Sequence, residues 1–257
     1  MRITTWNVNS IRARLPRVLE WLSEARPDVL CMQELKCQEH QFPLQAFEDL
    51  GYNVAIHGQK SWNGVAIASR TPLSGVIKGI PDPDDPQARG ISAIVGGVMV
   101  VNLYVPNGQE VGSDKYAYKL RWLEDLLGWL DGETDADDDL VVCGDYNICP
   151  EDKDTYDPEI WKGGILCSDP ERERFERLKA WGLTDALRHF DDASGIYTWW
   201  DYRAAMFRRG LGLRIDHHLL SASVLGRAKG VEVDRTARRG EKPSDHAPVT
   251  LVLGDVK

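Results

Sequence analysis

The sequence predicts an α+β fold, a four-layer α/β sandwich in which two mixed β-sheets pack face to face with helices on both outer sides. Three observations lead to this prediction. About ten short apolar runs have the length of strands, and about four segments repeat apolar residues at helical spacing. Some strands are joined by tight turns and others by helices, which is the mixture that mixed sheets require.

Length and composition indicate one soluble domain. The chain has 257 residues, 42% of them hydrophobic and nine of them tryptophan, and no shift of composition divides residues 1–257. No apolar run approaches the ~20 residues needed to span a bilayer. The N-terminal residues also lack the succession that is typical of a signal peptide. We therefore expect a single-domain, monomeric, cytoplasmic protein that acts without a membrane.

Charge and cysteine content narrow the class of partner. The net charge of −9 argues against binding polyanions by bulk electrostatics alone. The charges are unevenly placed, because residues 131–139 are acidic whereas residues 203–214 and 235–242 are basic. A local basic face that binds nucleic acid is therefore compatible with the negative net charge. The five cysteines are odd in number and form no close CxxC pair, which favours reduced thiols.

The predicted elements follow from local patterns in chain order. The expected strands cover residues 3–8, 28–32, 52–56, 64–69, 73–77, 91–95, 98–105, 141–145, 197–202, 213–220 and 247–253. Gly96 and Gly97 supply the positive φ angles of a two-residue hairpin turn. The first expected helix has Pro16 in its first turn and stops before Pro27. The other expected helices cover residues 42–50, 116–130 and 175–181, and Gly51 caps the earliest of these.

Polar side chains stand at six of the predicted strand edges. They are Asn7, Glu34, Tyr104 with Asn107, Asp145 with Asn147, Asp216, and Asp245 with His246. The first four groups follow their strands and the last precedes its strand, so an antiparallel final strand would bring all of them to one edge of the sandwich. A single Asn or Asp at a strand end more often caps a turn. Their joint occurrence predicts an active site.

The residue types at this edge point to hydrolysis of a phosphate ester. Carboxylates and amides are hard oxygen ligands that favour Mg²⁺ or Mn²⁺ over Zn²⁺, and Glu34 is the leading candidate ligand. His217 and His218 argue less for zinc, because adjacent strand residues point to opposite faces. A divalent metal beside an Asp and a His suits phosphoryl transfer to water. No GxxxxGK[ST] loop is present, so a reaction driven by hydrolysis of a nucleoside triphosphate is not expected.

Six motifs in register resemble one known family. The segments WNVNSIRAR, CMQELK, LYVPNGQ, GDYNICPEDKD, GLRIDHHLLS and KPSDHAPV resemble the exonuclease III family of abasic-site DNA repair nucleases. That family lies within the endonuclease, exonuclease and phosphatase superfamily, and the similarity runs from Met1 to about Leu253. It implies a Mg²⁺-dependent enzyme that cuts double-stranded DNA 5′ to abasic sites, trims blocked 3′ ends and has possible 3′-5′ exonuclease activity.

The resemblance implies roles for the residues at the metal and at the attacking water. Glu34 matches the principal Mg²⁺ ligand, with Asn7 and Asp245 close to the metal. Asp145 matches the aspartate that positions or deprotonates the water, and Asn147 matches the amide beside it that contacts the phosphate.

The resemblance also implies which residues hold the scissile phosphate. Tyr104 and His246 match groups that hydrogen-bond it, Asp216 matches the carboxylate that orients the histidine, and Asn107 matches a phosphate-contacting asparagine. Chemistry agrees, because a carboxylate behind an imidazole fixes its tautomer and keeps it protonated.

Contacts with DNA are predicted in the aromatic and basic loop. Trp199, Phe207, Leu213 and Ile215 surround the segment that in the family meets the sugar lacking a base, where an apolar pocket would reject a normal nucleotide by size. Trp199 and Trp200 also suit an ordinary core. Three arginines suit either DNA phosphates or a solvated face, and phosphates are favoured: Arg203, Arg208 and Arg209. Lys60 and Trp62 are weaker candidates.

Two departures leave part of the function open. Asn9 stands where some eukaryotic members have an aspartate, which puts a second metal ligand in doubt. Leu213 replaces a tryptophan of those relatives, so the balance between incision and exonuclease activity is not carried over. Two other functions remain as alternatives: a phosphatase or lipid phosphodiesterase of the same superfamily, and a catalytically silent DNA-binding protein.

Overall fold

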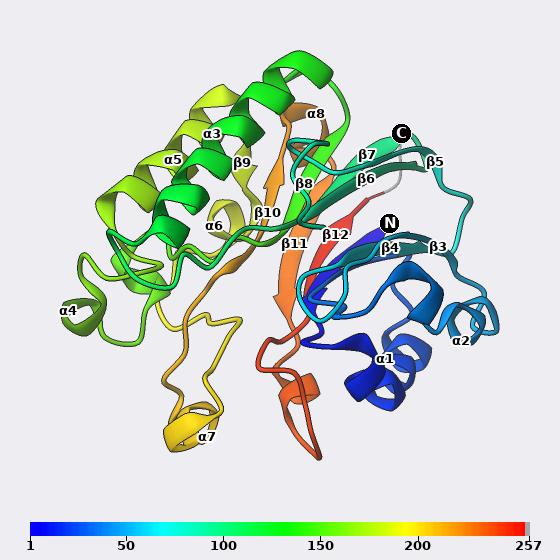
Figure 1. Cartoon of the computed structure of the whole chain (residues 1–257), viewed down its shortest axis with the longest axis horizontal. Helices are drawn as coiled ribbons and strands as arrows, with labels where there is room; N and C mark the ends of the chain where they lie inside the picture. The colour runs from blue at the N-terminus through cyan, green and yellow to red at the C-terminus, as the bar shows by residue number, and fades with distance from the viewer. Residues whose placement is uncertain (255–257) are drawn as a thin grey trace.

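The computed structural model describes residues 1–254, and these form four layers with two six-stranded sheets in the middle (Figure 1). The first sheet has the order β11 (Ala228–Val233), β12 (Val249–Leu253), β1 (Arg2–Asn7), β2 (Val29–Gln33), β4 (Val65–Ser69), β3 (Asn53–His57). The second has the order β5 (Ser74–Lys78), β6 (Gly90–Val95), β7 (Val98–Tyr104), β8 (Leu140–Asp145), β10 (Asp216–Leu220), β9 (Thr184–Asp185). The predicted fold class is confirmed.

Strand direction decides where the polar strand ends meet. β1 runs parallel to β2, and β7 runs parallel to β8. β12 lies antiparallel to β1, and β10 lies antiparallel to β8. The ends of β1, β2, β7 and β8 therefore lie at the same edge of the sandwich as the beginnings of β10 and β12.

Helices cover the outer face of each sheet (Figure 1). Helices α1 (Ile11–Ala25) and α2 (Leu44–Glu48) lie on the first sheet, and α3 (Asp114–Glu133) and α5 (Asp169–Trp181) lie on the second. The remaining helices are short: α4 (Pro158–Trp161), α6 (Ala186–Phe190), α7 (Met206–Arg209), α8 (Ala222–Leu225), and the 3₁₀ turns η1 (Glu39–Gln41), η2 (Asp152–Asp154), η3 (Arg203–Ala205) and η4 (Arg235–Arg238). Within residues 1–254, the helices are all too short or too polar to cross a bilayer.

Apolar cores fill the spaces between these layers. Alternate residues of the strands meet between the two sheets, where Ile3, Val100 and Leu251 are fully buried. A second core fills the space between α1 and the first sheet, and a third lies between α3, α5 and the second sheet. Burial on both faces explains why the central strands read as nearly continuous apolar runs.

The structure differs from several local predictions. Residues 197–202 form no strand, because Trp199 makes only isolated bridges to Leu213 and His246. Helix α1 begins at Ile11 after the Ser10 cap, so Pro16 lies inside it and not in its first turn. β11 was not predicted, since its half-exposed sequence AKGVEV has a weak apolar signal. The hairpin turn at Gly96 and Gly97 is confirmed by φ angles of 56° and 83°.

Candidate functional site

Strand ends bring the predicted polar residues to one edge of the sandwich. Asn7 ends β1 and Asp145 ends β8, while Glu34 follows β2 directly. In the sheet register, Asp145 pairs with both Tyr104 and Asp216. Asp216 thus opens β10, which begins at this residue and not at residue 213 as predicted. Residues of the same edge come from segments more than 200 positions apart in the chain.

Asn7 joins two carboxylates at the centre of this edge. Its Nδ2 donates to Glu34 Oε1 at 2.8 Å and to Asp145 Oδ2 at 2.9 Å. Asp145 is 1% exposed, and its other oxygen accepts from the backbone N–H of Asn147 at 2.9 Å. Asn147 adopts a left-handed φ of 50°, which turns the chain immediately after the strand. The carboxylate is therefore fixed in place by both of its oxygens.

A histidine with its own carboxylate lies on the other side of Asp145. His246 Nδ1 is 2.9 Å from Asp216 Oδ2, and His246 Nε2 is 3.7 Å from Asp145 Oδ2. Thr198 Oγ1 donates to Asp216 Oδ2 at 2.6 Å and holds that carboxylate in turn. With Asp216 behind Nδ1, the Nε2–H of His246 is directed to the side of Asp145.

Burial and neighbouring charge shift the pKa values of this pair. Burial raises the pKa of Asp145, the His246 imidazolium opposes the rise, and the result is about 7. Burial lowers the pKa of His246, but the carboxylates of Asp216 and Asp145 outweigh it and raise the pKa to about 10. At neutral pH His246 is therefore a cation that can donate a proton or a hydrogen bond to an anion.

The donor atoms of this edge suit a hard divalent cation. Glu34, Asp145 and His246 each offer one ligand atom, and these atoms lie within 4.8 Å of one another. Two carboxylates are oxygen donors of the kind that Mg²⁺ and Mn²⁺ prefer. Among the residues described, the structure groups Glu34 with Asp145 and not with Asp245. Asp245 instead accepts from Trp199 Nε1 at 3.0 Å and from Asn9 Nδ2 at 2.9 Å.

Two asparagines complete the edge beside Asp145. Asn107 Nδ2 donates to Asn147 Oδ1 at 3.0 Å, and Asn147 Nδ2 donates to the backbone oxygen of Val105 at 3.0 Å. Tyr104 lies next to them, with Arg89 stacked 4.9 Å from its ring centre. Burial, together with the nearby carboxylates of Glu34 and Asp145, raises the pKa of Tyr104 well above its usual range. Tyr104 therefore keeps its proton and can donate a hydrogen bond.

A pocket of about 580 Å³ opens beside Tyr104 and Asn107. Trp62, which is 69% exposed, and Arg89 border it as well. The exposed indole of Trp62 offers a flat apolar face to a ligand, whereas Arg89 is only 9% exposed and donates to Gln87 and to the backbone oxygen of Tyr104. Lys60 is exposed two residues before Trp62 and does not line this pocket.

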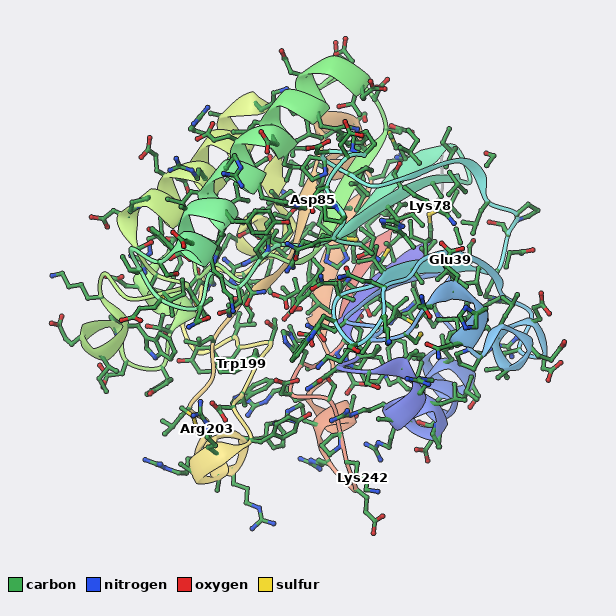
Figure 2. All side chains as sticks on the ribbon, in the orientation of Figure 1. Glu39, Lys78, Asp85, Trp199, Arg203 and Lys242 are labelled. Carbon is green, nitrogen blue, oxygen red and sulfur yellow. The ribbon has the colours of Figure 1, made fainter. Side chains whose placement is uncertain are left out.

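The predicted substrate residues separate into buried and exposed sets. Leu213 and Ile215 are 0% and 2% exposed and pack with Cys149 and Leu166, so they lie in the core and not on the open surface. Arg203 and Arg208 are exposed on the α7 loop, and Figure 2 shows Arg203 at the end of that loop, away from the sheets. Arg203 Nε donates to Asp201 Oδ1 at 3.0 Å, so the Asp201 carboxylate offsets part of the positive charge of Arg203.

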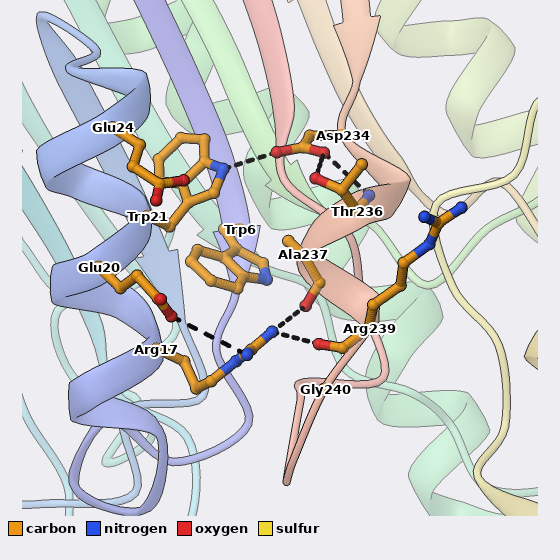
Figure 3. Close-up of a pocket in the computed structure, with 10 residues that line it drawn as sticks. All are labelled: Trp6, Arg17, Glu20, Trp21, Glu24, Asp234, Thr236, Ala237, Arg239 and Gly240. Atoms are coloured by element: carbon orange, nitrogen blue, oxygen red, sulfur yellow. Dashed lines mark hydrogen bonds and ion pairs between the residues drawn. The ribbon is translucent and has the colours of Figure 1, made fainter.

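The loop that carries His246 is held by contacts with β1 and α1. Trp6 Nε1 donates to the backbone oxygen of His246 at 3.2 Å. Trp6 also lines a hollow of about 340 Å³ between α1 and the loop after β11 (Figure 3). There Trp21 Nε1 donates to Asp234 at 2.8 Å, and Arg17 donates to the backbone oxygen of Ala237 at 3.2 Å (Figure 3). These contacts fix the loop against α1 and hence fix the position of His246.

Sequence reasoning missed a buried lysine that holds two loops of the site. Lys119 on α3 is fully buried, and its Nζ donates to the backbone oxygens of Asn147 at 2.6 Å and Asn107 at 3.2 Å. It also forms an ion pair with Glu171, which is equally buried. The sequence does contain a signal for Lys119, because a lysine on the apolar stripe of a helix would be buried and would need an oppositely charged partner. Thr198 and Lys36 also went unnoticed, and neither carries such a signal.

Replacing Lys119 by methionine is expected to lower the free energy of unfolding by about 3–5 kcal/mol, because the buried charge of Glu171 would lose its ion-pair partner. Urea denaturation followed by circular dichroism measures the change. Lys179→Met is the matched control: Lys179 pairs with Glu176 on the exposed face of α5, and its loss should cost about 0–1 kcal/mol. Equal effects of the two substitutions would contradict a structural role for the buried pair.

Comparison with known proteins identifies the family. The sequence model of the endonuclease/exonuclease/phosphatase family matches residues 4–246. The chain belongs to this family. Exodeoxyribonuclease III of Haemophilus influenzae is 36% identical, with 97% of this chain and 98% of that protein aligned. The DNA repair nuclease APEX1 of Danio rerio is 32% identical over 98% of this chain and 82% of that protein.

Solved structures of the family superpose on the whole fold. The 3′ phosphatase NExo from Neisseria, bound to a product DNA hairpin, is 47% identical with a TM-score of 0.96, and 99% of this chain and 100% of that chain are covered. An AP endonuclease from Archaeoglobus fulgidus is 40% identical with a TM-score of 0.96, and both chains are covered completely. The family resemblance read from the six motifs is confirmed.

Proposed function

We propose that the protein is a Mg²⁺-dependent DNA repair nuclease that hydrolyses the phosphodiester bond 5′ to an abasic site and removes blocking groups from 3′ ends. One observation carries this proposal: Asp145 lies between the carboxylate of Glu34 and the Asp216–His246 pair, so a metal ligand, a water-activating group and an anion donor meet at one edge. The relatives named as exodeoxyribonuclease III and AP endonuclease act on the same class of bond.

Different residues of the chain would bind the metal and activate the water. Glu34 would hold Mg²⁺, or Mn²⁺ in its place, with the Asn7 amide and the Asp145 carboxylate beside it. Asp245, the other predicted neighbour of the metal, is held by Trp199 and Asn9 instead. When bound, the cation offsets negative charge on the scissile phosphate. Asp145 is placed to orient a water and to accept its proton.

The donors around Asp145 would hold the phosphate. His246 donates through Nε2 to a phosphate oxygen, and Asp216 keeps that imidazole protonated and in register. Tyr104, Asn107 and Asn147 supply further donors from the opposite side. The phosphate then lies between two sets of donors, with the attacking water held by Asp145.

Double-stranded DNA is the proposed partner, and the exposed basic loops would hold it. Arg203 and Lys242 stand near the ends of two neighbouring loops below the sheets (Figure 2). Arg208 and Arg209 are exposed on the same α7 loop. Because the chain carries −9 overall, binding depends on this local positive surface. Trp199 reaches Asp245 from the base of the α7 loop, where it would contact the sugar, with Leu213 and Ile215 as buried support.

Cleavage of matched DNA duplexes tests the proposal. The substrates are an intact duplex, a duplex with one abasic analogue, and recessed duplexes ending in a 3′-hydroxyl or a 3′-phosphate. We expect Mg²⁺-dependent cleavage 5′ to the analogue that leaves a 3′-hydroxyl, and removal of the 3′-phosphate. Activity on small phosphoesters alone would favour a superfamily phosphatase, and DNA binding without cleavage would favour a silent binding protein.

The relative rates on these duplexes decide which activity dominates. Two of the similar structures, each 47% identical, are named as a 3′ phosphatase and a 3′-5′ exonuclease, while the AP endonuclease is 40% identical. A monomer is expected to carry out each reaction, since one chain supplies every group of the edge. Gel filtration of the active fraction checks this expectation.

Removing divalent cations with EDTA is expected to lower cleavage by about 10²-fold or more, because the developing charge on the phosphate loses its main counter-charge. Adding Mg²⁺ or Mn²⁺ in excess should restore the rate. Circular dichroism should not change, since protein donors already satisfy Glu34 and Asp145. Undiminished cleavage in EDTA would rule out a metal-dependent mechanism.

A further inference from the structure

Arg238, the last residue of η4, is buried between two loops of the site. One is the α7 loop, residues 201–212, and the other is the His246 loop, residues 239–248; both extend beyond the sheets (Figure 1). Arg238 is only 5% exposed. Within residues 1–254 its guanidinium is held by two backbone oxygens and not by a carboxylate. Burying a cation without a carboxylate partner is costly, which points to a role for Arg238 in the arrangement around it.

The guanidinium joins the backbones of the two loops. Its Nη1 donates to the backbone oxygen of Ser244, and its Nη2 donates to the backbone oxygen of Trp200 at 3.2 Å. The two chains already meet here, because the Trp200 N–H donates to the backbone oxygen of Asp245 at 3.0 Å. Ser244 Oγ accepts from the backbone N–H of His246 at 3.2 Å. Arg238 therefore holds the segment that leads directly into His246.

Two aromatic rings of the α7 loop lie against the same guanidinium. Its central carbon is 5.4 Å from the ring centre of Tyr202 and 4.9 Å from that of Phe207, distances at which a cation is attracted to an aromatic face. Phe207 also packs edge-on against Trp200, with 5.1 Å between the ring centres. The Tyr202 hydroxyl donates to the backbone oxygen of Pro243 at 2.7 Å. The rings of one loop are thus fixed by groups of the other.

The α7 loop has a strained backbone that needs support from outside. Ala204 and Ala205 adopt left-handed φ angles of 53° and 50°, which are unfavourable for residues that carry a side chain. The loop contains only the short turns η3 and α7, so few hydrogen bonds of its own hold this conformation. Contacts with Arg238 therefore help to maintain the conformation in which Arg203 and Arg208 are exposed.

We propose that Arg238 is a positioning residue that fastens the α7 loop to the His246 loop, so that bound DNA and the reacting edge keep one relative placement. The inference rests on the proposed function for the roles of the two loops. Arg238 itself is buried and contacts none of the reacting groups. A lysine would keep the charge, but one ammonium cannot reproduce the planar fork that bonds two carbonyls between two rings.

Hydrogen exchange followed by mass spectrometry tests the inference without cleavage. In Arg238→Met, peptides that cover residues 199–211 and 239–246 should exchange about ten-fold faster than in the wild type, because hydrogen bonds that join the two loops are lost. Peptides from β8 and α3 should exchange at the wild-type rate. Faster exchange along the whole chain would show only a global loss of stability, and unchanged exchange in both loops would show that Arg238 does not hold them; either result overturns the inference.

Binding and cleavage by Arg238 variants separate positioning from a simple effect of charge. Arg238→Met should bind a duplex with one abasic analogue about five-fold more weakly in EDTA, because a loosened α7 loop must be ordered on binding. Its single-turnover cleavage rate at saturating enzyme and Mg²⁺ should fall about ten-fold, because His246 is displaced from the phosphate. Arg238→Lys should recover only part of each loss. Full recovery by lysine would assign Arg238 an electrostatic role and contradict the inference.

The lysine variant also covers the case in which Arg238→Met does not fold by circular dichroism. Arg238→Lys should then show the same local increase in exchange to a smaller extent, and wild-type exchange in both loops would overturn the inference.

Arg177→Met is the matched control, because it removes an exposed guanidinium on α5 that pairs with Glu124 at 2.5 Å. It should match the wild type in exchange of both loops, in DNA binding and in rate, and an equal loss would contradict a specific role for Arg238. A wild-type protein that binds the abasic duplex without cleaving it would refute the proposed function, whereas the exchange data would still decide whether Arg238 holds the two loops.

Discussion

Asp145→Asn is expected to lower the rate of abasic-site cleavage by about 10³-fold or more while the protein stays folded. An amide keeps the shape of the carboxylate but cannot accept a proton from water. It also carries no charge to share with Glu34 in holding a divalent cation. Single-turnover cleavage of a duplex with one abasic analogue, with enzyme in excess over DNA, measures the chemical step directly.

The control for this substitution is Asp125→Asn, an exposed carboxylate on α3. Its cleavage rate should equal that of the wild type. DNA binding by the Asp145 variant should persist, because the basic loops are unchanged. Near-normal cleavage by a folded Asp145→Asn protein would remove Asp145 from the chemistry and leave it as a structural turn residue.

Asp216→Asn is expected to move the alkaline limit of cleavage to lower pH by about one unit or more, because an opposite charge in contact with the imidazole is lost. In the wild type the carboxylates hold the pKa of His246 at about 10, so the imidazolium is present below that pH and is lost as the pH rises through it. Removing the Asp216 charge lowers this pKa. The cation then disappears at a lower pH.

The same substitution should move the acid limit in the same direction. Asp216 helps burial to raise the pKa of Asp145, which is about 7 without metal. Without that neighbouring charge, Asp145 ionises at lower pH and activity begins earlier. A rate profile from pH 5 to 10.5 at saturating Mg²⁺ measures both limits, and His246→Ala should remove the alkaline limit together with most of the activity. A uniform loss of rate with both limits unchanged would show that Asp216 does not act through His246.

The pattern of the sequence was sufficient for the architecture. Apolar runs such as 98–104 and the stripe on α3 are long and regular, so local spacing alone indicates strand or helix. Predictions failed where the local signal was mixed. β11 alternates half-exposed residues. The aromatic run 197–202 owes its conformation to backbone hydrogen bonds with Leu213 and Asp245, which are distant in the chain and leave no local pattern.

The sequence by itself determined which residue types stand at the strand ends, and hence the kind of chemistry: Asp145, Glu34 and His246 follow or precede apolar runs that must be buried. Only the tertiary structure decided how they pair. It placed Asp145 rather than Asp245 with Glu34, and it brought Lys36 and Lys119 into the site. The physical reason is that burial is encoded by residues close together in the chain, whereas a hydrogen bond or ion pair depends on distances of about 3 Å between side chains, and only the packed sheets fix those distances.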